Sequence, residues 1–109
     1  MTPEEYEWER RHIMDPRERR AFMRHLGFRK LDFRFAPLPM APGEAVPDYF
    51  DILGQVFHPE WQARGAVPGA AILATFALMW RRINPVDAEP ALARLAREVE
   101  GRWIPLVEA

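Results

Sequence analysis

The chain has 109 residues, of which 49% are hydrophobic, and a net charge of −1. This length suits one domain, because a second domain would lack the apolar mass for a core of its own. The sequence contains no cysteine, which excludes a disulfide scaffold, a thiolate metal site and a cysteine nucleophile.

The charges are grouped along the chain rather than mixed. Residues 1–9 carry a charge of −4, and residues 10–34 carry nine basic and three acidic groups, hence +6. Residues 36–63 then carry −4 without a basic residue. Segments of opposite charge suit contact between segments of one chain, or an oriented contact with a charged partner.

Two sequence signals near the N-terminus each predict the start of a helix. The sequence TPEE at residues 2–5 combines an N-cap residue, a first-turn proline and a capping-box carboxylate, and DPRE at residues 15–18 repeats this signal. We predict helices over residues 3–13 and 16–26, the second ending at Gly27. The first has only a thin apolar stripe, so we interpret it as an arm that docks on another molecule.

Residues 28–35 alternate apolar and charged side chains, the pattern of a half-buried strand. No second strand is predicted, so this segment either pairs with another chain or is extended and only packs its aromatic side chains. The next segment, residues 36–47, is predicted to be an extended wrap. Four prolines deny it both helical and ladder hydrogen bonds: Pro37, Pro39, Pro42 and Pro47.

The second half of the chain predicts three more helices. Residues 48–57 are nearly apolar all round, and a break at His58-Pro59 and a short helical turn follow them. Residues 68–83 form the next predicted helix, which Asn84-Pro85 ends, and residues 89–103 form the last, with apolar side chains at helical spacing until Pro105.

The expected fold class is therefore mostly α. We expect a small single-domain helical protein of four to five short helices, with a Pro-rich extended segment and at most one short strand. Residues 1–47 would form the N-terminal helical arm and the extended segment, and residues 48–109 the helical core.

Groups suited to catalysis or metal binding are scarce in the sequence. The chain has no serine, two threonines and one lysine, so the usual covalent nucleophiles are nearly absent. Its three histidines, His12, His25 and His58, belong to different predicted elements and lack the close ligand pair typical of zinc sites. We therefore expect no enzymatic activity, no cofactor and no metal ion.

The function that fits most of these observations is protein–protein interaction. The chain would be an accessory, assembly or inhibitory subunit of a larger complex, and its partner another protein or a second copy of itself. Aromatic anchors supply most interface energy, and arginines match charge. The predicted partner-binding residues are Tyr6, Trp8, Phe33 and Phe35, with Arg17, Arg20 and Arg24. The alternative is that these aromatic residues fold back onto the chain's own core.

A membrane subunit is one alternative function. Residues 65–80 contain no charge, Trp61 and Trp80 could mark two interfaces, and Arg81 and Arg82 follow. A helix of this length is about 24 Å long, short of the roughly 30 Å hydrocarbon core. Because the N-terminus also lacks the pattern of a secretion signal, we expect a cytoplasmic location, with membrane association through residues 66–80 as the alternative.

Nucleic-acid binding through residues 10–34 is the second alternative. Arginines bind phosphate bidentately and aromatic side chains stack on bases, and this segment interleaves both kinds of residue. The acidic flanks and the net charge of −1 weaken the general attraction on which such binding depends. A protein surface is therefore the favoured partner.

Overall fold

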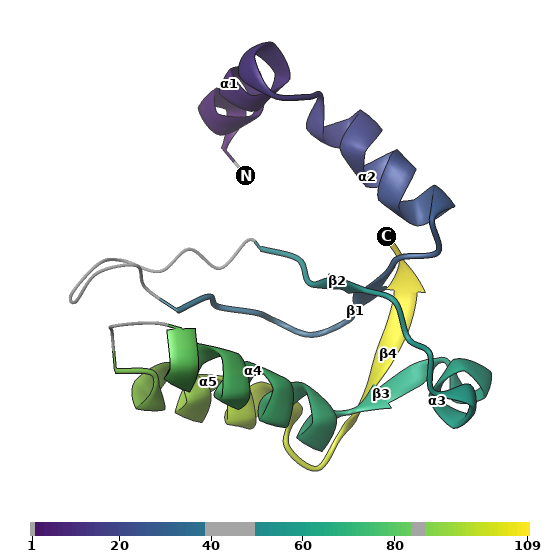
Figure 1. Ribbon diagram of the computed structural model, residues 1–109, viewed down its shortest axis with the longest axis vertical. Helices are drawn as coiled ribbons and strands as arrows, with labels where there is room; N and C mark the ends of the chain where they lie inside the picture. The colour runs from purple at the N-terminus through teal and green to yellow at the C-terminus, as the bar shows by residue number, and fades with distance from the viewer. Residues whose placement is uncertain (1, 39–49, 84–86) are drawn as a thin grey trace.

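The computed structural model describes residues 2–38, 50–83 and 87–109, which form helices packed with a four-stranded antiparallel sheet (Figure 1). The sheet order is β2-β1-β4-β3. The helices are α1 (Pro3–His12), α2 (Pro16–His25), α3 (Pro59–Arg64), α4 (Gly69–Ile83) and α5 (Glu89–Val99). The strands are β1 (Arg29–Leu31), β2 (Leu53–Gly54), β3 (Ala66–Pro68) and β4 (Trp103–Glu108).

The two N-terminal helices agree with the prediction from capping signals. The Thr2 side chain accepts a hydrogen bond from the backbone N–H of Glu5, and the Glu5 carboxylate accepts one from the backbone N–H of Thr2, which completes a capping box at α1. Asp15 caps α2 in a similar way, through the backbone N–H of Arg17. The chain leaves α2 at Gly27, whose φ of +91° favours glycine.

The prediction of a mostly α fold with at most one strand is wrong, because the sheet has four strands. The last predicted helix ends at Val99, and the turn at Gly101, with a φ of +71°, leads into β4. In β4, Ile104 and Leu106 are buried while Trp103 and Pro105 are exposed, a period of two. The apolar side chains of residues 92–103 have helical spacing, so the sequence did not reveal the change to a period of two in β4.

The predicted helix over residues 48–57 is also wrong for its described part. Residues 50–58 are extended, and β2 pairs antiparallel with β1, with Arg29 opposite Gly54. An apolar run of this length fits a buried extended segment as well as a buried helix, so periodicity could not separate the two. Ile52 and Val56 are β-branched, and Gly54 lies between them, a composition that favours the extended form.

The uncharged run at residues 65–80 is not a single helix. Residues 66–68 form β3, which pairs antiparallel with β4, and α4 starts only at Gly69. Strand β2 comes from a segment that the sequence had predicted to be helical, and the β4 residues that pair with β1 lie beyond the last predicted helix, where no strand was predicted. Residues 28–35 therefore lacked a partner in the prediction. The sheet thus joins residues from the first 47 positions with residues from the second half.

Helices α4 and α5 lie side by side and cover one face of the sheet (Figure 1). The main core forms between these helices and the strands, and Val99 and Ile104 are fully buried in it. Its buried members are Phe35, Val67, Ile72, Leu95, Val99, Ile104 and Leu106. A smaller cluster extends the core along α5 and consists of Leu38, Ala88, Ala91 and Leu92.

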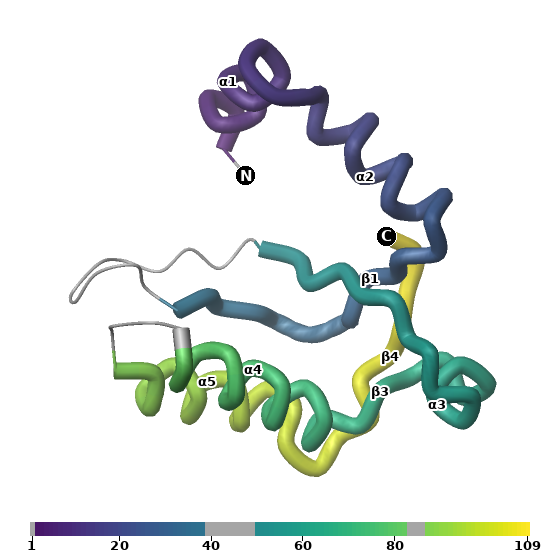
Figure 2. The backbone as a smooth tube through the Cα atoms, viewed as in Figure 1, coloured from purple at the N-terminus to yellow at the C-terminus, as the bar shows by residue number. Residues whose placement is uncertain are grey.

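Helices α1 and α2 lie on the other side of the sheet from α4 and α5 (Figure 2). Neither of the two N-terminal helices buries a residue. The molecule measures 40 × 37 × 20 Å, and its radius of gyration of 15.2 Å exceeds the roughly 13 Å of a compact domain of about 100 residues. This difference reflects two helices that extend from the core instead of covering it.

Gly69 is the point where α4 comes closest to the end of α5. Its backbone N–H donates to the Arg102 carbonyl at 2.7 Å, and a Cβ atom at this position would lie 1.7 Å from the Val99 carbonyl oxygen. The obstacle is backbone, which cannot rotate away. Any larger residue at position 69 must separate α4 from the turn that leads into β4.

We predict that Gly69→Ala lowers the free energy of unfolding by about 3 kcal/mol, because the added methyl group forces a backbone shift in a packed junction. Urea denaturation followed by circular dichroism measures the loss. Gly54→Ala is the matched control, since a Cβ there meets no atom within 4 Å. A wild-type midpoint for Gly69→Ala would contradict the close approach.

Candidate functional site

The two N-terminal helices form one unit, which we call the arm (residues 3–25). The Tyr6 hydroxyl donates to Asp15 Oδ1 at 2.9 Å, and Arg19 pairs with Glu9 at 2.7 Å, so both contacts tie α1 to α2. The backbone N–H of Arg17 and the Tyr6 hydroxyl lower the pKa of Asp15 by donating hydrogen bonds to it. The same bond to Asp15 raises the pKa of Tyr6.

Polar contacts join the arm to the sheet. Arg20 pairs with Asp51 at 3.0 Å, and Arg24 pairs with Glu108 at 3.1 Å. The Gln55 side chain donates to the carbonyl of Leu26 at 2.7 Å, just after α2. Exposed ion pairs contribute about 0–1 kcal/mol each, so these two pairs orient the arm more than they stabilise it.

Asp51 is the acceptor that α2 and β1 share. Its second carboxylate oxygen lies 3.4 Å from the Lys30 ammonium group. Partial burial alone would raise the pKa of Asp51, but the hydrogen bonds and charges of Arg20 and Lys30 outweigh that effect, so its pKa lies below the ordinary value of 3.8. The carboxylate is therefore charged at neutral pH and holds both cations.

Apolar side chains remain exposed on the arm and at the connections that flank it. Trp8 is 56% exposed and Phe22 is 57% exposed. Phe22 and Leu26 are four residues apart, so they share one side of the helix end. The full set of exposed large apolar residues in this region is Trp8, Ile13, Met14, Phe22 and Leu26. Single exposed apolar residues are ordinary on a protein surface, but five within 19 positions are a concentration.

The predicted partner-binding residues lie in two different places, and the first group is on the arm. Tyr6, Trp8 and Arg17 are together on the arm, where the Arg17 guanidinium lies 5.3 Å from the centre of the Tyr6 ring. Arg20 and Arg24 are also on the arm, and both make the ion pairs to the sheet described above.

The other two predicted anchors lie in a different place. Phe35 is 7% exposed and belongs to the core, where its ring contacts Phe76 and Trp80. Phe33 is half-buried and packs against the same core. For this pair the described structure matches the alternative in which the aromatic residues fold back onto the chain. The pattern of residues 28–35 carried this signal, because Phe33 and Phe35 share the buried side of an alternating segment.

Four exposed apolar residues of the arm region were not among the predicted anchors: Ile13, Met14, Phe22 and Leu26. The helical wheel places Phe22 and Leu26 on the apolar side of an amphipathic helix, a position that normally packs against a core. Only the path of the described chain shows that Phe22 and Leu26 remain exposed. Sequence alone could therefore identify the apolar face but not its exposure.

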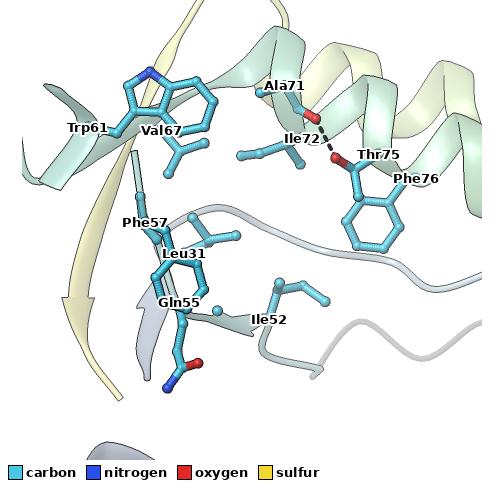
Figure 3. Close-up of a pocket in the computed structure, with 12 residues that line it drawn as sticks. Leu31, Ile52, Gln55, Phe57, Trp61, Val67, Ala71, Ile72, Thr75 and Phe76 are labelled. Atoms are coloured by element: carbon cyan, nitrogen blue, oxygen red, sulfur yellow. Dashed lines mark hydrogen bonds between the residues drawn. The ribbon is translucent and has the colours of Figure 1, made fainter. Parts of the chain in front are cut away.

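An apolar pocket of about 300 Å³ opens between the extended segment around β2 and the first turns of α4 (Figure 3). Ile52, Phe57, Trp61 and Ile72 are among its lining side chains. Two polar side chains reach it, and each donates to a backbone carbonyl: Gln55 to Leu26 and Thr75 to Ala71. The pocket can therefore receive an apolar group but offers little to orient a polar substrate.

Two further observations concern metal binding and membrane crossing. Within residues 2–38, 50–83 and 87–109, no group of three or more His, Cys, Asp or Glu side chains is placed to hold a metal ion. No helix in the described ranges combines the length and the apolar character that a membrane crossing requires. Helix α4, the most apolar of them, has 15 residues.

No family model, no curated protein and no solved structure matches the chain. The arm, the pocket and the exposed side chains are therefore the features that indicate a function. Of these features, the arm departs most from the usual arrangement of a small domain, because its apolar residues are not covered by its own core.

We predict that Asp51→Asn loosens the arm and costs less than about 1 kcal/mol of global stability, because exposed ion pairs contribute little. Amide hydrogen exchange in α2 should accelerate, and exchange in α5 should stay unchanged. Because the folded pKa of Asp51 is lowered, its contribution is present above the ordinary value of 3.8 and is lost as the pH falls through the folded pKa.

The difference between the two proteins should therefore be largest above about pH 5 and should vanish in stronger acid. Glu60→Gln, which removes a carboxylate at the start of α3, is the control. Equal exchange in α2 of wild type and Asp51→Asn at pH 7 would show that Asp51 does not hold the arm.

Proposed function

We propose that the protein is a non-catalytic subunit that binds another protein through the outer surface of its arm. The observation that carries this proposal is that α1 and α2 bury no residue within the chain, although they present Trp8 and Phe22 at more than half exposure. Tryptophan is the residue type most enriched at interface hot spots, and apolar surface gains about 25 cal/mol per Å² when it leaves water.

The limited stability of the arm supports docking. Each of its helices has 10 residues, and isolated helices shorter than about 12–15 residues are marginal in water. Its links to the sheet that are described above are ion pairs and hydrogen bonds, not a buried apolar contact. A partner that covers Trp8 and Phe22 would supply apolar packing that residues 2–38, 50–83 and 87–109 do not give them.

The charges of the arm define the kind of partner. Arg20 and Arg24 have carboxylate partners in this chain, and Arg19 pairs with Glu9, so much of the basic charge of residues 10–34 is balanced internally. This pairing favours an apolar protein groove over a phosphate backbone, which requires many uncompensated cations. Arg17 is exposed, and Arg11 is exposed beside its partner Glu7, 3.8 Å away; both would match acidic residues at the rim of that groove.

The pocket beside α4 is consistent with a non-catalytic role. Reactive sites usually combine an apolar cavity with several convergent polar or titratable groups. The two polar side chains of this pocket, Gln55 and Thr75, already donate to backbone carbonyls. We therefore place the function on the arm and not in the pocket.

We predict that the double substitution Trp8→Ala and Phe22→Ala weakens binding to the natural partner about 30-fold or more, which is the effect of removing about 2 kcal/mol at a hot spot. The partner is first captured on the wild-type protein, identified by mass spectrometry and purified. Its dissociation constant is then measured by isothermal titration calorimetry with each variant.

Phe57→Ala is the matched control, because Phe57 is another exposed aromatic residue but lies outside the arm. It should leave the affinity unchanged, and all variants should keep the wild-type thermal midpoint. Equal affinity of the double variant and wild type would exclude the arm as the docking surface. A collapsed melting curve of the double variant would show instead that Trp8 and Phe22 stabilise the chain itself.

A further inference from the structure

The edge of the sheet formed by β2 is open in the described part of the chain. Strand β2 ends the order β2-β1-β4-β3, so β1 pairs with one of its sides and no described strand pairs with the other. The chain stays extended around it, and we call residues 52–57 the β2 edge. This segment contains no charged residue and no proline, which are the residues that usually prevent an edge strand from pairing with another chain.

The register of the ladder shows which backbone groups of the β2 edge are unpaired. The backbone N–H of Leu31 donates to the Ile52 carbonyl at 2.9 Å, within the antiparallel pairing of β1 and β2. Backbone groups alternate in direction along such a pair, so those of Ile52 and Gly54 turn toward β1, and those of Leu53 and Gln55 turn away from it. Among the described residues, no backbone hydrogen bond reaches the outward N–H and C=O groups of Leu53 and Gln55.

The apolar pocket lies beside these unpaired groups. Its lining includes residues 54–57 of the β2 edge, and the first turns of α4 form the facing wall (Figure 3). Ile52 and Val56 pack against the core, so position 54, which shares their side of the strand, also faces inward. Gly54 carries no side chain there, and a Cβ atom would meet no other atom within 4 Å. An incoming apolar side chain therefore has space over Gly54.

We propose that the β2 edge binds an extended peptide segment of another protein as an added antiparallel strand. The added strand would pair with the outward N–H and C=O groups of Leu53 and Gln55. Its alternate side chains would enter the pocket beside α4, because successive side chains of a strand point to opposite faces. The antiparallel direction follows the rest of the sheet, in which every described pair of strands is antiparallel.

The unpaired backbone identifies the occupant. A row of alternating N–H and C=O groups is matched by another extended backbone, whereas a helix or a small apolar molecule would fill the pocket and leave this row unpaired. The pocket supplies the apolar part of the contact, and the backbone supplies the orientation that its side chains do not give. This inference goes beyond the proposed function, which uses the arm and not the β2 edge.

The size of the contact sets the expected affinity. A single short strand buries less than the roughly 800 Å² per partner of a standard interface, so we expect a dissociation constant of about 10–100 µM. Two synthetic peptides serve as probes, one alternating leucine with threonine and one alternating phenylalanine with threonine. Each has an apolar face for the pocket and a polar face for solvent.

Nuclear magnetic resonance of the isotope-labelled full chain measures the binding of these peptides. We expect saturable shifts at the β2 edge and in the first turns of α4. Amide hydrogen exchange of Leu53 and Gln55 should slow about 10-fold at a peptide concentration of about 10 times the dissociation constant, because the peptide covers their unpaired N–H groups. Exchange of Leu95, which lies in the core on α5, should stay unchanged.

Backbone methylation of the peptide separates strand pairing from apolar contact alone. In an antiparallel pair, the threonines lie opposite Leu53 and Gln55 and turn their N–H groups to β2. N-methylation of the threonines should therefore weaken binding at least about 10-fold, since it removes backbone hydrogen bonds. N-methylation of the leucines is the matched control and should change the affinity less than about threefold, because these N–H groups face away from β2.

Variants of the chain test the same contact from the other side. Leu53→Pro removes an outward N–H but leaves the ladder with β1, so it should keep the wild-type thermal midpoint and weaken peptide binding about 10-fold. Leu53→Ala, which keeps the N–H, is its control and should bind normally. Gly54→Leu places a side chain in the space meant for the peptide and should also weaken binding, so the test remains decisive if one variant fails to fold.

Three outcomes would overturn the inference. The first is the absence of saturable binding by either peptide. The second is equal binding of the peptides with and without methylated threonines. The third is slow exchange of Leu53 and Gln55 in the free protein, which would show that the edge is already covered. Because the arm variant Trp8→Ala with Phe22→Ala should bind the peptides normally, a failure of this inference remains distinguishable from a failure of the proposed docking function.

Discussion

The pairing of β1 with β4 is the constraint on which the arrangement of the molecule depends. It places Leu31 opposite Leu106 and Arg29 opposite Glu108, and so joins the N-terminal third of the chain to its last strand. Ile104 and Leu106 of β4 are buried against the helices. At the end of the same strand, Glu108 accepts from Arg24 of α2. One ladder therefore connects the core to the arm.

The two sides of the sheet are held by different kinds of contact. On one side of the sheet, apolar side chains from strands and helices exclude water, and the backbone contact at Gly69 leaves no room for adjustment. On the other side, hydrogen bonds and exposed ion pairs hold the arm, and such contacts are weak and sensitive to salt. The arm can therefore change its contacts at low cost while the core remains intact, a property common among surfaces that recognise partners.

Local signals in the sequence were sufficient for some elements and not for others. Capping residues defined α1 and α2, and Gly27 defined the end of α2, because these signals act within one helical turn. Strands β2 and β4 could not be predicted in this way. The apolar residues of β2 also fit a buried helix, and those of β4 follow directly on a helical pattern that ends before Pro105. Both strands depend on a ladder with β1, which is distant in sequence. Similarly, Trp8 and Phe35 are both aromatic residues in the N-terminal third, and only the path of the chain exposes one and buries the other.

The close approach of Gly69 to the end of α5 has a consequence for how the chain can vary. The turn after α5 leads from Val99 to the start of β4, and the carbonyl groups of Val99 and Arg102 already lie against Gly69. A residue inserted into this turn would have to bulge away from α4, because no space is left on the side of Gly69. The connection between α1 and α2 has no such obstacle among the described contacts, so changes in its length should be easier to accommodate.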